Sequence, residues 1–285
     1  MVFSVAAVSF LNTIPLVAQF TDLGDPRIAL TLDLPSRVAD KLTSGQADAG
    51  LVPTVEVLRG RTGGILSPAG IACDGPVDSV ALFAAGPLPG LQRVLVDRGS
   101  RTSIALLRLL LAELHGSRPV FIVKEPVPGL RLEPGEGILV IGDRCFAQYA
   151  ALRAGNPDGI TAHDLGDLWK RMTGLPFIFA AWACSSRLVA EATPQEIRDL
   201  GDLLTTARDY GLARLEELAI REAAAGKLGR AGEASAAAID YYFRKSLRFI
   251  LGEREMAGLH RFKELCVVHG LAPDNPNPEL LYLRR

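Results

Sequence analysis

The chain has 285 residues, of which 48% are hydrophobic, 22% charged and 6% aromatic, and its formal net charge is −1. This composition is typical of a folded globular protein with one large domain or two ordinary lobes, and it excludes disordered, collagen-like and disulfide-scaffold proteins. Because 31 basic residues balance 32 acidic ones with no long run of like charge, neither nucleic acid nor an anionic membrane is an expected partner.

The N-terminal 21 residues carry no charged side chain. A secretory signal needs a positively charged start, whereas the first basic residue is Arg27 and Asn12, Thr13 and Pro15 interrupt the apolar run. We therefore predict a buried strand over Phe3–Val8, a polar turn and a short helix near Pro15, in a protein that stays in the cytoplasm and has no membrane segment.

Short apolar runs then alternate with helical patterns. The predicted strands are 28–32, 47–52, 94–97, 120–123 and 138–142, and the predicted helices are 35–44, 53–59 and 100–115. Such alternation, with Gly and Pro between the segments, is typical of an α/β protein with parallel strands.

The C-terminal part of the chain changes character after one more strand-like run at 177–183. From there we predict a wholly helical region, with helices at about 194–210, 212–225, 234–251 and 255–268. Thr193, followed by Pro194 and then Glu196, has the pattern of a capping box with proline at the first helical position, which predicts the start of the first of these helices.

No metal site is expected. The four cysteines (Cys73, Cys145, Cys184 and Cys266) and the four histidines (His115, His163, His260 and His269) are scattered, without the spacings that present two ligands to one ion. We predict that the cysteines are small buried side chains.

Polar turns lie where predicted strands end and helices begin, which is where open α/β sheets bind ligands. The turns Ser9–Thr13 and Gly99–Ser103 would each aim backbone N–H groups and short polar side chains outward, a combination that attracts a carboxylate. Two such turns suggest a ligand with two anionic ends, although both could simply cap helices. A third polar turn, 73–79, places Ser79 where it could face a cleft or merely end a turn.

The segment Val8–Leu16, read Val-Ser-Phe-Leu-Asn-Thr-Ile-Pro-Leu, resembles the opening motif of the chorismate dehydratase family. Further stretches resemble the family in the same order: 33–37, 74–80, 99–103, 173–177 with Trp182, and 241–270. The resemblance therefore extends over nearly the whole chain.

This resemblance implies an α/β fold of the type-2 periplasmic-binding-protein kind, with two lobes, a cleft between them and a helical C-terminal region. Lobe one would comprise 1–83 and 181–285, and lobe two 84–180. The chain would cross between the lobes near 79–84 and 177–183, so that the turns at Asn12 and Ser100–Ser103 would face each other across the cleft.

The resemblance also implies an activity. The expected reaction is that of a lyase, which converts chorismate to 3-[(1-carboxyvinyl)oxy]benzoate and water on the futalosine route to menaquinone, without cofactor or metal. Two alternatives stay open. One is an enzyme like the 1,4-dihydroxy-6-naphthoate synthase of the same pathway, whose Ser-Pro-Cys-Pro-Asn-Asp-Thr opening is absent here; the other is a non-catalytic binding protein for a small dicarboxylate.

Asn12 and Ser79 are the expected catalytic residues, holding the hydroxyl or a carboxylate of chorismate. The expected substrate-binding residues are Ser9, Thr13, Ser100, Arg101, Thr102, Ser103, Gly142 and Asp143. Arg101 could instead be a surface or lobe-contact residue, and Asp143 could cap the helix that follows it. Since the turns are poor in acids and bases, we hypothesise that one of the substrate's own carboxylates is the base, with Asp143 as the alternative.

The chain also departs from the family pattern at three places beside these motifs. They are Cys73, the segment Arg144–Phe146, and Arg98 with Gly99. These departures bear on substrate contacts more than on family membership.

Overall fold

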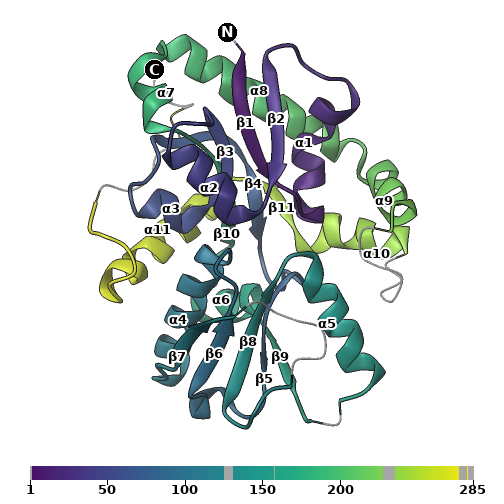
Figure 1. The fold of residues 1–285 in the computed structure, drawn as a ribbon, viewed down its shortest axis with the longest axis vertical. Coiled ribbons are helices and arrows are strands. Elements are labelled where there is room, and N and C mark those ends of the chain that lie inside the picture. The colour runs from purple at the N-terminus through teal and green to yellow at the C-terminus, as the bar shows by residue number, and fades with distance from the viewer. Residues whose placement is uncertain (1, 125–130, 157, 227–234, 276–280, 282–285) are drawn as a thin grey trace.

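The computed structural model describes residues 2–124, 131–156, 158–226, 235–275 and 281. Its strands form two sheets, one above the other in Figure 1. The first has the order β11-β4-β10-β3-β1-β2 and consists of β1 (Phe3–Val8), β2 (Ile28–Asp33), β3 (Ala49–Pro53), β4 (Gly64–Cys73), β10 (Phe177–Cys184) and β11 (Arg248–Ile250). The second has the order β7-β6-β8-β5-β9 and consists of β5 (Val80–Ala84), β6 (Arg93–Val96), β7 (Val120–Val123), β8 (Glu136–Ile141) and β9 (Thr161–Asp164).

Each sheet has three neighbouring parallel strands at one edge, as predicted of parallel strands, and antiparallel additions that the sequence did not reveal. β1 pairs in parallel with β2 and β3, and β6 pairs in parallel with β7 and β8. β4, β5, β9, β10 and β11 make antiparallel pairs. The strands β5 and β10 enter their sheets from the other half of the molecule, so no helical crossover fixes them as parallel.

The helices lie against the two sheets (Figure 1). In chain order they are α1 (Ile14–Asp22), α2 (Pro35–Thr43), α3 (Thr54–Leu58), α4 (Arg101–His115), α5 (Asp143–Ala154), α6 (Leu165–Thr173), α7 (Ser186–Glu191), α8 (Pro194–Leu212), α9 (Leu215–Ala224), α10 (Ala236–Tyr241) and α11 (Glu253–Val268). Short 3-10 turns occupy Leu11–Thr13 (η1) and Leu88–Gly90 (η2), and a π turn occupies Tyr242–Ser246 (η3).

The long helix α8 begins with the predicted capping box. Thr193 accepts a hydrogen bond from the Glu196 backbone N–H, and the Glu196 carboxylate accepts one from the Thr193 backbone N–H. Its other end packs tightly on α1 at Gly211. A Cβ atom on this residue would lie 1.9 Å from the Pro15 carbonyl oxygen. Glycine is therefore required at this helix contact.

The prediction of one helix over 234–251 is confirmed for 236–246, which form α10 and the π turn η3, and is wrong from residue 247 on; residue 234 lies outside the described residues. The chain leaves α10 through the π turn and forms β11, which pairs with the edge of β4. Phe249 is buried while Arg248 and Ile250 are exposed, which is the alternation of a half-buried strand. The free edge of β4 therefore outweighs the local helical preference of this segment.

The two predicted lobe boundaries both fall within strands. The 83/84 boundary lies inside β5, which pairs with β8 and β9 of the second sheet, and the 180/181 boundary lies inside β10, which pairs with β3 and β4 of the first. The chain therefore changes sheet just before these strands, at 74–79 and 174–176. The division into lobes stays a proposal with these adjusted crossings.

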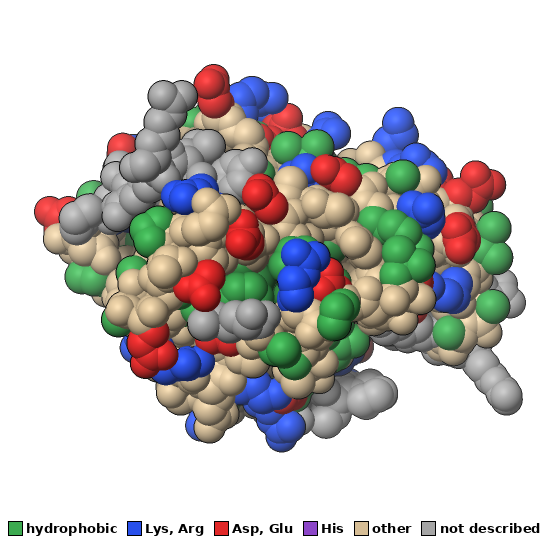
Figure 2. Space-filling view, turned by 90° about the horizontal axis from the view of Figure 1, so that it is seen from above, with side chains coloured by type: hydrophobic (Ala, Val, Ile, Leu, Met, Phe, Trp, Pro, Cys, Tyr) green, Lys and Arg blue, Asp and Glu red, His purple; other side chains and the backbone are tan. Residues whose placement is uncertain are grey.

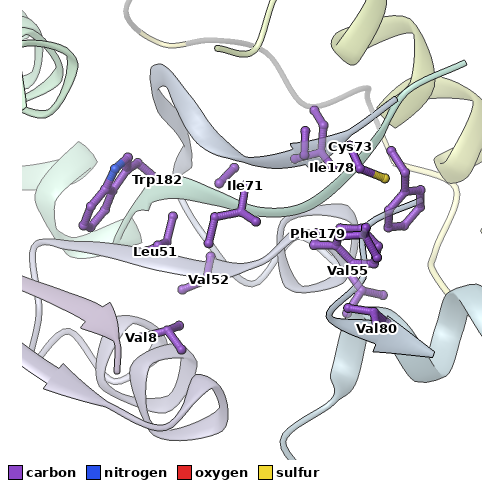
Figure 3. Packing of buried hydrophobic residues seen from close by; sticks show 14 of the residues in the cluster. Val8, Leu51, Val52, Val55, Ile71, Cys73, Val80, Ile178, Phe179 and Trp182 are labelled. Atoms are coloured by element: carbon purple, nitrogen blue, oxygen red, sulfur yellow. The ribbon is translucent and has the colours of Figure 1, made fainter. Parts of the chain in front are cut away.

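The main hydrophobic core lies around β3, β4 and β10 and continues toward the second sheet. In Figure 3, Trp182 lies beside Leu51, and Phe179 lies close to Val55 and Val80. A smaller cluster around Phe83 and Cys145 packs on the second sheet. All four cysteines are buried and unpaired, as predicted, and burial raises the pKa of the Cys184 and Cys266 thiols to about 12.

Basic and acidic side chains are interspersed on the face seen in Figure 2. None of the described helices is both long and apolar enough to cross a membrane. Within the described residues, no group of three or more His, Cys, Asp or Glu could hold a metal ion.

Candidate active site

A cavity opens between the two sheets, at the ends of β1, β3 and β8. Its empty space is about 510 Å³ counted with the solvent at its mouth. Its polar lining consists of six of the predicted site residues, Asn12, Ser100, Arg101, Thr102, Ser103 and Gly142. The two predicted turns thus meet at one cavity.

The remaining wall is apolar and was not predicted. It consists mainly of Val8, Phe10, Pro35, Pro53, Ile71, Val80, Ile141 and Phe179. The sequence could have indicated Phe10, because this residue lies inside the predicted Ser9–Thr13 turn. Ile71 and Phe179 lie on antiparallel strands, away from the predicted turns, so the sequence contained no signal for them. The combination of apolar walls and a few polar groups suits an organic acid.

Four predicted site residues do not line this cavity. Ser9 is exposed, whereas Thr13 is buried beneath the turn and donates a hydrogen bond to the Asn12 side-chain oxygen at 3.4 Å. Ser79 and Asp143 lie next to the cavity-lining residues Val80 and Gly142. Their roles in substrate binding or catalysis stay predictions.

The N-terminus of α4 presents an unused hydroxyl to the cavity. Ser100 is the N-cap residue of this 15-residue helix and is only 2% exposed. An N-cap serine normally accepts a hydrogen bond from the first turn of its helix, but the Ser100 Oγ makes no such bond and has no partner among the described residues. A buried hydroxyl without a partner is unfavourable unless a ligand supplies one.

The next two residues of α4 contact the other side of the cleft. The Thr102 Oγ1 accepts a hydrogen bond from the Val55 backbone N–H at 3.2 Å. The Arg101 guanidinium pairs with Asp40 at 2.8 Å and with the buried Glu56 carboxylate at 3.3 Å. Arg101 therefore lines the cavity while its charge is neutralised by the facing helices α2 and α3, as the lobe-contact alternative predicts.

The start of α5 also contacts the opposite side. The Asp143 Oδ1 accepts a hydrogen bond from the Leu11 backbone N–H at 3.0 Å, and no side chain caps α5 at its N-cap residue, Gly142. The alternative that Asp143 caps its own helix stays a prediction beside this contact. Gly142 has a φ of +66°, and a Cβ atom there would lie 2.9 Å from the Phe10 ring, so glycine is required for this close approach.

Ser79 forms a buried pair with a residue that the sequence did not single out. The Tyr242 hydroxyl donates a hydrogen bond to the Ser79 Oγ at 2.8 Å. Burial raises the pKa of Tyr242, while hydrogen bonds to the Ser79 and Asn12 side chains act in the opposite direction. The one sequence signal for Tyr242 is that it lies inside the 241–270 stretch that resembles the family.

The turn that leads to Ser79 is fixed by Asp164. Its carboxylate accepts hydrogen bonds from the backbone N–H groups of Val77, Asp78 and Asp167. Burial raises the pKa of the Asp164 carboxyl to about 6, although these backbone hydrogen bonds act to lower it. The predicted third turn is thus held by a carboxylate from the second sheet.

The departures from the family pattern lie around this site. Arg144 pairs with Asp97 at 3.2 Å, and the Phe146 ring makes an edge-on contact with Tyr242, with ring centres 4.9 Å apart. Cys73 and Cys145 are buried, and desolvation raises the pKa of both thiols. Among these departures, Phe146 is the one in direct contact with the Ser79–Tyr242 pair.

Comparison with known proteins agrees with this geometry. A family described as menaquinone biosynthesis matches residues 3–267. The chain is 35% identical over 243 residues to the chorismate dehydratase of Thermus thermophilus, covering 81% of this chain and 84% of that relative.

Solved structures of distant sequence share the fold. A Candida albicans gene product with the generic periplasmic binding protein fold superposes with a TM-score of 0.64 at 13% identity, over 97% of this chain and 92% of that one. The alkanesulfonate-binding protein of Xanthomonas axonopodis pv. citri gives 0.62 at 14% identity, over 95% and 94%. The predicted periplasmic-binding-protein-like fold and the family resemblance are both confirmed, and the chain belongs to the menaquinone biosynthesis family.

Proposed function

We propose that this protein is a chorismate dehydratase that converts chorismate to 3-[(1-carboxyvinyl)oxy]benzoate and water. The observation that carries the proposal is the cavity in which the unpartnered Ser100 hydroxyl at the start of α4 and the Asn12 turn meet between apolar walls. The 35% identical chorismate dehydratase supports it independently. The same proposal includes the futalosine route and a cytoplasmic location.

Chorismate has features that match both kinds of wall. It carries two carboxylates, an allylic hydroxyl and a flat ring. One carboxylate would accept hydrogen bonds from Ser100 and from first-turn N–H groups of α4 other than that of Arg101, which donates to the Gly99 carbonyl oxygen. The ring would lie against Phe10 and Phe179.

The reaction is a redox-neutral elimination. The hydroxyl leaves one ring carbon, and the proton leaves the neighbouring carbon that bears the enolpyruvyl ether; the electron pair of that C–H bond becomes the third ring double bond. Proton and hydroxide together form the released water. Because the product is aromatic, the step is strongly favoured and we propose that it needs no cofactor.

The proton acceptor in this proposal is one of the substrate's own carboxylates. Asp143, the alternative base, accepts the Leu11 backbone N–H and lies outside the cavity lining, which supports a role in holding the two sides together. Asn12 and Ser79 would hold the leaving hydroxyl or a carboxylate. The enzyme would then act mainly by fixing the reacting groups in the geometry of elimination.

The test is to incubate the purified protein with chorismate and EDTA, without any cofactor, and to follow ultraviolet absorbance and product mass. We expect a product lighter than chorismate by one water. Asn12→Ala and Ser79→Ala should each lower kcat by about 100-fold or more, with unchanged circular dichroism.

Two other results would overturn the proposal. Chorismate that binds but persists would indicate a binding protein for a dicarboxylate. If chorismate is neither bound nor changed but cyclic dehypoxanthinyl futalosine is cleaved, the protein is instead the later enzyme of the same pathway.

A further inference from the structure

We propose that Tyr242 is a positioning residue for the dehydration, because its hydroxyl donates a hydrogen bond to the Ser79 Oγ and so directs the Ser79 proton toward the substrate. The inference rests on the proposed function, in which Ser79 and Asn12 hold the reacting end of chorismate. It adds a residue that comes from the C-terminal region, 163 positions away in the chain.

The hydrogen bond sets the direction in which Ser79 can donate. A serine hydroxyl has one proton and two acceptor positions, and one acceptor position is taken by Tyr242 at 2.8 Å. Tyr242 is 2% exposed and Ser79 is 1% exposed, so water does not compete for this pair. Because burial raises the pKa of Tyr242 further above neutrality, the tyrosine remains a donor, and the Ser79 proton is left for another acceptor.

The π turn that carries Tyr242 holds the Ser79 segment at two points. Besides the Tyr242–Ser79 contact, the Ser246 hydroxyl donates to the Asp78 Oδ2 at 2.5 Å. Asp78 has a φ of +61°, a conformation that is unfavourable for residues other than glycine and needs such support. Turns of the π type occur frequently at functional sites. The π turn η3 thus fixes Asp78 and Ser79, the two residues that precede β5 of the second sheet.

The Tyr242 ring is also fixed by the second sheet's side of the cleft. Phe146 of α5 makes an edge-on contact with it, at 4.9 Å between ring centres. Among the described residues, the titratable side chains that act on the hydroxyl are Asp143 and Cys145, both at the start of α5. The Tyr242–Ser79 pair thus lies where the three segments around the cavity come together.

The primary test compares two neighbouring tyrosines. Tyr242→Phe removes the donor and keeps the ring, whereas Tyr241→Phe is a matched control, since Tyr241 is 61% exposed. We expect Tyr242→Phe to lower kcat by about 10- to 100-fold with KM changed by less than about threefold. Tyr241→Phe should stay within about twofold of wild type in both, and far-ultraviolet circular dichroism should be the same for all three proteins.

A double-mutant cycle with Ser79→Ala separates positioning from simple structural support. If Tyr242 acts through Ser79, then adding Tyr242→Phe to Ser79→Ala changes kcat by less than about twofold. A double variant at least about fivefold slower than Ser79→Ala overturns the inference, as does a Tyr242→Phe variant with wild-type kcat. If Tyr242→Phe does not fold, the inference is tested by comparing Ser79→Ala with the double variant. The double variant removes both hydroxyls of the buried pair, so it leaves no single hydroxyl without its partner.

Wild-type turnover of chorismate is measured first, in the same assay. If the wild type forms no product, the proposed function fails and the inference fails with it. If the wild type forms the product and only the Tyr242 results depart from expectation, the inference alone is overturned.

Discussion

Asp143 at the start of α5 accepts a hydrogen bond from the backbone N–H of Leu11, at 3.0 Å, across the cavity between the two sheets. The contact joins the polar turn after β1 to the turn after β8, which are the two turns that carry Asn12 and Gly142. Substitution of Asp143 therefore tests how far the geometry of the cavity depends on this hydrogen bond.

We expect Asp143→Ala to raise KM for chorismate about tenfold, since a hydrogen bond to a charged group contributes about 1.5–3 kcal/mol. Asp143→Asn keeps an acceptor oxygen and should have a smaller effect on KM. Steady-state kinetics at several pH values measure both. If Asp143→Asn abolishes kcat and leaves KM unchanged, Asp143 and not a substrate carboxylate is the base.

Ser100→Ala should separate stability from binding. Removing a buried hydroxyl that has no protein partner should leave the melting temperature unchanged or raise it, because no hydrogen bond is lost on folding. Binding should weaken by about 1 kcal/mol, or roughly fivefold in Kd. Calorimetric unfolding and titration with chorismate measure the two effects, and a destabilised protein with unchanged affinity would contradict the assignment of this hydroxyl to the ligand.

Gly142→Ala should disturb the approach of the two sides. The new Cβ would lie 2.9 Å from the Phe10 ring, on a backbone with a φ of +66°. We expect turnover to fall more than about tenfold, since small misplacements at a site have large effects on rate. Gly142→Ala combined with Phe10→Leu should recover part of the loss. If the double variant is no better than Gly142→Ala, the backbone conformation and not the ring contact is decisive.

The Asp164 carboxyl should make stability depend on pH in a defined direction. Its pKa is raised to about 6 in the folded protein, whereas an unfolded aspartate titrates near 3.9. Folding therefore favours the protonated form, so the contribution of Asp164 to stability is fully present below about pH 4 and is lost as the pH rises through about 6.

Denaturant unfolding of the wild type and of Asp164→Asn between pH 3.5 and pH 7.5 tests this expectation. The asparagine variant loses hydrogen bonds at every pH, but its stability relative to the wild type should rise with pH, by at most about 1.4 kcal/mol per pH unit. The rise should stop above about pH 6.5. A difference that is constant over this range would show that Asp164 has an ordinary pKa when folded.

The sequence allowed the cavity to be predicted where a local rule applies. Asn12, Ser100 and Gly142 follow parallel strands of the two sheets, and polar residues at such strand ends converge in α/β folds. Whether each side chain is free for a ligand could not be predicted, because that depends on partners from distant segments. The Ser100 hydroxyl has no partner in the described part of the chain, whereas Arg101 one residue later is paired with Glu56.

The C-terminal region shows the same difference between local and distant information. The capping box of α8 was readable from four adjacent residues, and it is present. The strand β11 and the Tyr242–Ser79 pair were not readable, because each is formed by contact with a segment more than 160 positions earlier in the chain. Tertiary contacts of this kind override the local preference for helix.

The buried Glu56 carboxylate has a consequence for any movement of the two halves. It pairs with Arg59 and Arg61 of its own half, both at 3.1 Å, as well as with Arg101 from the facing helix. A motion that withdrew Arg101 would leave the Glu56 carboxylate paired with Arg59 and Arg61. The carboxylate would therefore not become an unpaired charge in an apolar environment. Parting of the cleft would therefore break the Arg101 contacts with Glu56 and Asp40 and leave the two ion pairs at the end of the short helix α3 intact, an arrangement that suits repeated entry of substrate and exit of product.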